Sequence, residues 1–150
     1  MKTKTYHQIA QEDYETARFL LDGNRLNPSI EYIQQFVEKS FKEIIVRKGD
    51  SESDEDKLLL GSHNLSRLAQ RVEKLMEVKF SKEENLYLRA LRNVYFSTSC
   101  PGDSYEDIDK ETATDMFEWC TEFKVKVDVL IDKAVQQQQL KPSNIFNGGI

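Results

Sequence analysis

The sequence predicts an all-α fold, an up-and-down helical bundle of about five helices. Two observations lead to this prediction. The six glycines and three prolines cluster at a few positions among the 150 residues and leave four long intervals free of both. Within those intervals apolar residues recur every three or four positions, the period of an amphipathic helix and not the two-residue period of a strand. We therefore expect helices throughout the chain.

The first two helices have clear end signals. The first runs to about Leu21, and Gly23 follows it as a C-terminal stop. The second begins with Asn27 as N-cap and Pro28 at the first helical position, and it continues to Gly49. Their buried stripes are expected to consist of Tyr6, Ile9, Ala10, Asp13, Ala17, Leu20 and Leu21 in the first helix, and of Ile30, Ile33, Phe36, Val37, Phe41, Ile44 and Ile45 in the second.

The remaining three helices follow from caps and spacing in the same way. A third begins at a cap, Ser62, and ends near Lys79. The run Ser81-Lys82-Glu83-Glu84 is a capping box, so a fourth helix starts there. The last extends from about Lys110 to Gln138, and Cys120 occupies one of its apolar positions as a core residue.

Three segments are expected to lie outside the bundle. The acidic run from Asp50 to Lys57 is interpreted as a solvated loop, and Ser97 to Asp109 as a longer connection with a Pro101-Gly102 turn. Residues 1–140 are predicted to form a single helical domain, and residues 141–150 a loose C-terminal tail. Docking of a partner on that tail is the alternative interpretation.

Composition excludes several classes of protein. The formal net charge of −5 and the pI near 5.2 argue against non-specific DNA binding, which requires a basic surface. No apolar run approaches the roughly 20 residues of a membrane span, and no secretory signal opens the chain, so we expect a cytoplasmic protein that does not enter a membrane. Two cysteines and two histidines lack the spacing of metal ligands, so neither a metal site nor a cofactor is predicted.

A set of polar and apolar motifs recurs in order along the predicted helices. They are Ala10-x-x-Asp13-x-x-x-Ala17-x-x-Leu20-Leu21, Gln34-Gln35-Phe36-Val37-Glu38-Lys39-Ser40-Phe41-Lys42, Ser62-His63-Asn64-Leu65-x-x-Leu68, and Leu91-Arg92-Asn93-x-Tyr95 followed by Cys100-Pro101-Gly102-Asp103. Over roughly residues 8–135 this order resembles the HEPN family. Its members are small helical bundles often found beside, or fused to, minimal nucleotidyltransferases.

The resemblance carries expectations about function. It implies a homodimer with a polar cleft that binds a nucleotide or RNA, and a minimal nucleotidyltransferase as a partner. Catalytic members of the family are metal-independent ribonucleases with an Arg and, four to six residues later, a His. Arg92-Asn93 matches the first half of that motif, but the window for the histidine holds Ser97, Thr98 and Ser99. The sequence therefore predicts no catalytic residue.

The candidate site residues follow from the same motifs. We expect the nucleotide contacts to be Arg92, Asn93, Tyr95, Lys39 and His63, and the polar cleft to include Asp13 and Gln35. For two of them a structural role is the alternative. Asp13 would pair with Lys39 or Gln35 of the second helix. His63 would cap its own helix or contact the second one.

Charge is unevenly distributed along the chain. Ser62 to Asn93 contains seven basic and four acidic residues, whereas Asp103 to Lys133 contains ten acidic residues and four lysines. The four arginines of the basic segment form two pairs at helical spacing, Arg67 with Arg71 and Arg89 with Arg92. Each arginine is able to bind a phosphate through two hydrogen bonds. The alternative is that they form salt bridges with the acidic last helix, within the chain or across a dimer.

Three functions remain open at this point. The first is a non-catalytic HEPN-type module that binds a nucleotide or RNA, or partners a minimal nucleotidyltransferase. The second is a divergent HEPN ribonuclease, the toxin of a toxin–antitoxin pair. The third is a protein-interaction module without a ligand. The missing histidine favours the first over the second.

Overall fold

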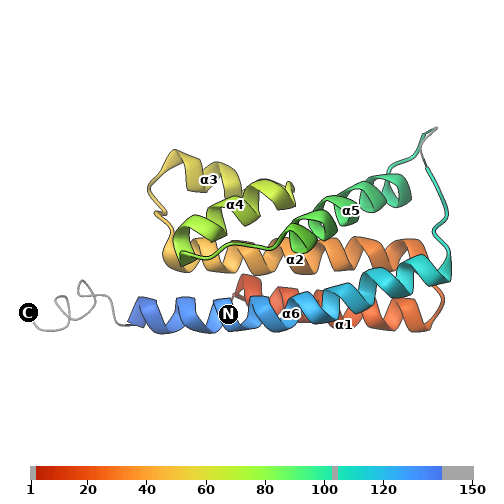
Figure 1. The fold of residues 1–150 in the computed structure, drawn as a ribbon, viewed down its shortest axis with the longest axis horizontal. Coiled ribbons are helices and arrows are strands. Elements are labelled where there is room, and N and C mark those ends of the chain that lie inside the picture. Colours follow the sequence, from red (N-terminus) through yellow and green to blue (C-terminus); the bar gives the residue numbers. More distant parts are fainter. Residues whose placement is uncertain (1–2, 103–104, 140–150) are drawn as a thin grey trace, which may run out of the picture.

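The computed structural model describes residues 3–102 and 105–139, and the all-α prediction is confirmed (Figure 1). Within these ranges there are six helices and no strand: α1 (Tyr6–Asp22), α2 (Leu26–Lys48), α3 (Asp54–Leu60), α4 (Leu65–Met76), α5 (Lys82–Ser99) and α6 (Lys110–Gln139). None of them is long and apolar enough to cross a membrane. The predicted tail, residues 141–150, lies outside the described residues.

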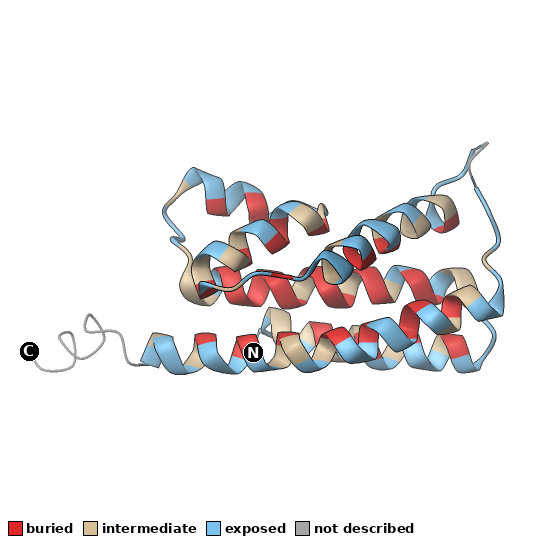
Figure 2. Ribbon diagram, viewed as in Figure 1, coloured by how far each residue is buried: buried red, intermediate tan, exposed pale blue. Residues whose placement is uncertain are grey.

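Helix α2 is the centre of the bundle. It is the one helix that packs against all five others, and thirteen of its residues are buried. Figure 1 shows α1 and α6 running along one side of α2, with α3, α4 and α5 along the other. Figure 2 shows buried residues over most of the length of α2, whereas the outer faces of the other helices are exposed. Polar residues of α2 are therefore held in fixed positions by the neighbouring helices.

Two aromatic clusters tie the helices to α2. Tyr14 of α1 lies between Phe36 and Phe117, with ring centroids 5.4 Å and 5.1 Å away. Phe41 lies 6.0 Å from Phe123 of α6. Because these rings also bury large apolar areas, they contribute much of the free energy that holds α1, α2 and α6 together.

The helix ends differ in part from the predicted caps. The capping box is confirmed, since the Ser81 side chain accepts the Glu84 N–H and the Glu84 side chain accepts the Ser81 N–H. The predicted caps Ser62 and Asn27 are wrong. The N-cap of α4 is Asn64, whose side chain accepts two backbone N–H groups, and α2 begins before Asn27, at Leu26.

Asn27 has a tertiary role instead of a capping role. Its amide Nδ2 donates to the carbonyl oxygens of Glu106 at 2.9 Å and Thr98 at 3.3 Å, and its Oδ1 accepts the Ile108 N–H at 2.9 Å. One side chain thus fixes both ends of the α5–α6 connection against the start of α2. Asn and Asp are common at helix caps because their side chains bond to nearby backbone groups. The backbone groups that Asn27 binds are instead distant in sequence.

The acidic segment from Asp50 to Lys57 is predicted to be a solvated loop, and this prediction is wrong for its second half, although six of its eight residues are exposed. Its second half begins helix α3, with Ser53 as N-cap accepting the Asp56 N–H. The Asp56 side chain is 1% exposed and binds Arg71 of α4. Acidic residues in the first turn stabilise a helix through its dipole, and the ion pair allows one of them to be buried.

Candidate functional site

A buried carboxylate on α2, Glu38, organises a polar cluster. It is 1% exposed. Its Oε2 accepts a hydrogen bond from Lys42 Nζ at 2.9 Å and lies 3.8 Å from Lys39 Nζ. Its Oε1 lies 2.9 Å from Nδ1 of His63, in the segment before α4. A buried charge requires such partners, so the position of Glu38 fixes the positions of the groups around it.

Lys42 and Glu38 were not among the candidate site residues, although both belong to the motif of the second helix. The spacing of four residues predicts that they share a helix face. That this face is buried, with Lys42 only 4% exposed, depends on the helices packed over it.

Lys39, Gln35 and Asp13 extend the cluster toward α1. Lys39 Nζ donates to Gln35 Oε1 at 2.7 Å. Burial raises the pKa of Asp13 to about 6; the Lys39 charge opposes this shift, while Glu12 and Glu38 add to it. Asp13 forms no hydrogen bond with Lys39 or Gln35 in the part of the chain that the structure describes, so its link to the cluster is electrostatic.

His63 connects the cluster to solvent. Its backbone carbonyl accepts a hydrogen bond from Gln34 Nε2 at 3.3 Å, and Glu38 holds its ring through Nδ1. The side chain is nevertheless 76% exposed. His63 thus contacts the second helix, as its structural interpretation predicts, and also has an accessible ring, as a role in nucleotide binding requires.

Tyr95 approaches the cluster from α5. Burial raises the pKa of the Tyr95 hydroxyl, and the nearby carboxylates of Glu31 and Glu38 and the Cys100 thiol raise it further. The ring also lies 5.9 Å from that of Phe96. Tyr95 therefore lies within electrostatic range of the same carboxylate that binds His63 and Lys42.

Arg92 and Asn93 lie within one turn of Tyr95 on α5 but, within the described chain, do not bond to the carboxylate of the cluster. The Arg92 guanidinium lies 5.7 Å over the ring of Phe96, and Asn93 is exposed. Across residues 3–102 and 105–139, neither residue contacts Glu38 or His63 through a hydrogen bond or an ion pair. Of the predicted nucleotide contacts, Lys39 and His63 thus lie against Glu38, whereas Arg92, Asn93 and Tyr95 lie within one turn of one another on α5.

Among the described residues, the four arginines of the basic segment form no salt bridge with the last helix of the same chain; bridges across a dimer stay a prediction. Arg71 pairs with Asp56 of α3, and Arg67, Arg89 and Arg92 form no ion pair within the described chain. The bridge that joins α5 to α6 has the opposite polarity, since Lys126 of α6 donates to Glu84 of α5 at 2.8 Å.

The chemistry of the Glu38 cluster suits binding. Glu38 positions a cation for phosphate, Lys39, and an accessible imidazole, His63. Tyr95 of α5 adds an aromatic ring within electrostatic range of Glu38. Among the described residues, no group of three or more His, Cys, Asp or Glu side chains is placed to hold a metal ion.

Comparison with known families gives one match. The family model described as "HEPN domain" matches residues 3–129, which include α1 to α5 and the first two thirds of α6. The resemblance found in the motifs is thereby confirmed. Comparisons with curated proteins and with solved structures find no match.

Proposed function

The chain belongs to the HEPN domain family, and we propose that it is a non-catalytic module of that family which binds a nucleotide or a segment of RNA at the Glu38 cluster. The observation that carries this proposal is the anchoring of an exposed imidazole, His63, to a carboxylate that is 1% exposed. A binding group held in place before the ligand arrives loses little entropy on binding.

Each side chain of the cluster has a specific role in this proposal. Lys39 supplies positive charge for a phosphate group. Tyr95 and the His63 ring provide flat surfaces on which a base stacks, an interaction worth roughly 1–3 kcal/mol per base. Asp13 and Gln35 form the polar wall toward α1. Arg92 and Asn93 contact the part of the ligand that extends along α5.

Calorimetric titration with nucleotides and short single-stranded RNAs tests the proposal. Tyr95→Ala, His63→Ala and Lys39→Met should each weaken binding by about tenfold, the effect of losing roughly 1.4 kcal/mol. Lys133→Met, which removes an exposed lysine of α6, is the control for charge alone. If no nucleotide or RNA binds saturably at millimolar concentration, the chain is instead an interaction module without such a ligand.

A ribonuclease is the second candidate, and the His63–Glu38 contact favours it. A carboxylate that binds one ring nitrogen fixes the tautomer and leaves the other nitrogen to exchange protons. Arg92 would supply the cation for the developing phosphorane charge. RNA cleavage that disappears in both Arg92→Ala and His63→Ala would replace the binding proposal by this one.

The assembly that we propose is a cytoplasmic homodimer with a minimal nucleotidyltransferase as a possible further partner. Light scattering tests the dimer, because a monomer at micromolar concentration would have a mass of 17.5 kDa. Sequencing the neighbouring genes and co-expressing this chain with any minimal nucleotidyltransferase found there, followed by co-purification, tests the second partner.

A further inference from the structure

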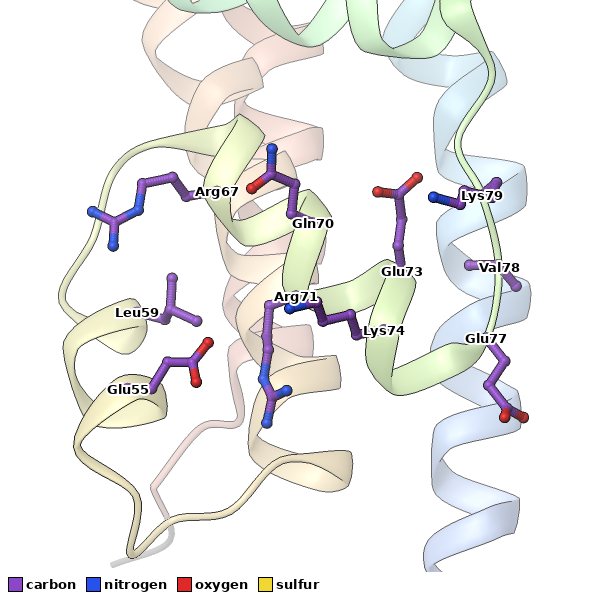
Figure 3. Close-up of a pocket in the computed structure, with 10 residues that line it drawn as sticks. All are labelled: Glu55, Leu59, Arg67, Gln70, Arg71, Glu73, Lys74, Glu77, Val78 and Lys79. Carbon is purple, nitrogen blue, oxygen red and sulfur yellow. The ribbon is translucent and has the colours of Figure 1, made fainter.

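A groove between α3 and α4 lies outside the Glu38 cluster. Its volume is about 700 Å³, within the usual range for small-molecule sites. Leu59 of α3 and Val78, after α4, provide its apolar surface. None of its lining residues belongs to the Glu38 cluster. Figure 3 shows the polar side chains that surround it, most of them from α4.

One face of α4 supplies a row of hydrogen-bond donors to this groove. Arg67, Gln70, Arg71 and Lys74 follow the spacing of three and four residues that brings side chains together on a helix. Arg67 and Lys74 are exposed and form no ion pair with the described part of the chain. In Figure 3 Arg67 extends from α4 toward α3, and Lys74 extends beside Arg71. The α4 wall thus carries three positive charges.

Arg71 is held rigidly in this wall. Its Nε and Nη2 donate to the two carboxylate oxygens of Asp56 at 2.8 Å and 3.0 Å. Asp56 in turn accepts the Asp50 N–H at 2.7 Å. The guanidinium therefore has a fixed orientation, and its Nη1 is not used in the Asp56 contact. A planar fork fixed in this way is pre-organised for a planar or tetrahedral oxyanion.

Three carboxylates also line the groove, those of Glu55, Glu73 and Glu77. Glu73 accepts the Phe80 N–H at 2.8 Å, and in Figure 3 Glu77 points away from the other labelled side chains. The hydrogen bond from Arg71 to Asp56 raises the pKa of the Arg71 guanidinium, and the nearby carboxylates of Glu55 and Asp50 raise it further. The lining thus carries four cationic side chains against these three carboxylates. Arg71 is already paired with Asp56, whereas Arg67, Lys74 and Lys79 form no ion pair with the described part of the chain.

We propose that the α3–α4 groove binds a phosphomonoester group, with Arg67, Gln70, Arg71 and Lys74 as donors and with the organic part of the ligand against Leu59 and Val78. A phosphomonoester has close to two negative charges and three acceptor oxygens, which suit a row of arginine, amide and ammonium donors. The groove is large enough to hold a mononucleotide. A free mononucleotide and the 5′ end of an RNA present the same group.

The test compares four probes by calorimetry: inorganic phosphate, a nucleoside 5′-monophosphate, and one short RNA with either a 5′-phosphate or a 5′-hydroxyl. We expect the monophosphate to bind more tightly than inorganic phosphate, because only the former contacts Leu59 and Val78. If the 5′-phosphate improves RNA binding about tenfold, the site accepts RNA ends; if the monophosphate alone binds in the groove, it accepts free nucleotides. Absence of saturable binding by every phosphorylated probe overturns the proposal.

Variants assign the binding to the groove. Arg67→Ala and Lys74→Ala should each weaken it roughly five- to tenfold, since each removes one phosphate contact. Glu55→Gln should tighten it about two- to fivefold, because it removes one of the opposing charges. Arg25→Ala is the matched control, because this exposed arginine before α2 does not line the groove and forms no ion pair with the described part of the chain. If the substitutions at Arg67, Lys74 and Glu55 leave the affinity for the monophosphate unchanged, the proposal is overturned.

The proposals for the two sites can be refuted independently of one another. His63→Ala should leave phosphomonoester binding in the α3–α4 groove unchanged, whereas Arg67→Ala should leave binding at the Glu38 cluster unchanged. If His63→Ala abolishes all phosphate-dependent binding and Arg67→Ala has no effect, the groove is not a site and the Glu38 cluster remains one.

Discussion

Removing the ion pair between Glu38 and Lys42 by substitution is the best test of how the polar cluster is stabilised. The two side chains are 1% and 5% exposed, and the Nζ–Oε2 distance is 2.9 Å. Removing one partner of such a buried pair costs about 3–5 kcal/mol, because the other charge stays buried without compensation. We expect Glu38→Met to reach this range. Lys42→Met should fall near its lower limit, since Glu38 keeps His63 and Lys39 as partners.

The double variant gives the more discriminating result. Replacing both charges by apolar side chains of similar volume leaves no unpaired buried ion, so Glu38→Met with Lys42→Met should cost only about 1–2 kcal/mol. The sum of the two single variants would be roughly 6–8 kcal/mol. In thermal unfolding, each kcal/mol corresponds to about 2–4 °C for a chain of this size. Glu38→Met should therefore unfold roughly 6–20 °C below the parent chain.

Urea unfolding at pH 7 measures these free energies. Circular dichroism reports the helices, and Trp119 fluorescence reports the core, because its indole stacks on the buried Tyr87 ring at 5.2 Å. Lys4→Met is the control. It breaks an exposed pair with Glu12, and such pairs contribute less than about 1 kcal/mol.

Two results would refute the reasoning. If Glu38→Met or Lys42→Met costs less than about 1 kcal/mol, the pair is hydrated and does not hold the cluster. If the cost of the double variant equals the sum of the single costs within about 0.5 kcal/mol, the two charges are independent of one another.

Other parts of the fold give further predictions. Because burial raises the pKa of Asp13 from 3.8 to about 6, the folded chain retains a proton there that the unfolded chain has lost, and this carboxyl reduces stability as the pH rises through that window. Asp13→Asn should therefore gain stability relative to the parent chain between pH 4 and pH 7 in urea unfolding; a constant difference would contradict this. A Cβ at Gly49 would lie 2.6 Å from a backbone carbonyl oxygen, so Gly49→Ala should cost roughly 1–3 kcal/mol. Gly61→Ala, where the nearest atom is 3.6 Å away, should change stability by less than about 1 kcal/mol, and an equal loss at both positions would refute the steric argument. Asn27→Ala removes the bonds that fix the α5–α6 connection, so limited proteolysis should cut residues 100–109 several-fold faster than in the parent chain, while an unchanged rate would show that other contacts hold the connection.

Local signals in the sequence account for much of the fold. The apolar period predicts the helices because one face of each must be buried, and the structure buries Ile30, Ile33 and Phe36 of α2 as that period requires. The capping box at Ser81 could also be predicted from local sequence, because its hydrogen bonds join residues three positions apart. The order of motifs also identified the family, which the match over residues 3–129 confirms.

Helix α3 shows where local signals were insufficient. The acidic run before Leu58 has the composition of a solvated loop. The burial of Asp56 within this run depends on its bond with Arg71, 15 residues away, and a charge pattern does not specify such a pair. Asn27 was misread for the same reason, because its partners lie more than 70 residues away.

The sequence by itself determined that the chain is a helical bundle of the HEPN family and that its middle segments are basic. It also supplied Lys39, His63 and Tyr95 as candidates, but not the residue that organises them. Only the tertiary structure decided that Glu38 is buried and that His63 reaches it from 25 positions away. The physical reason is that helix periodicity sets which side chains share a face, whereas the cost of burying a charge depends on the partners that other helices bring to it.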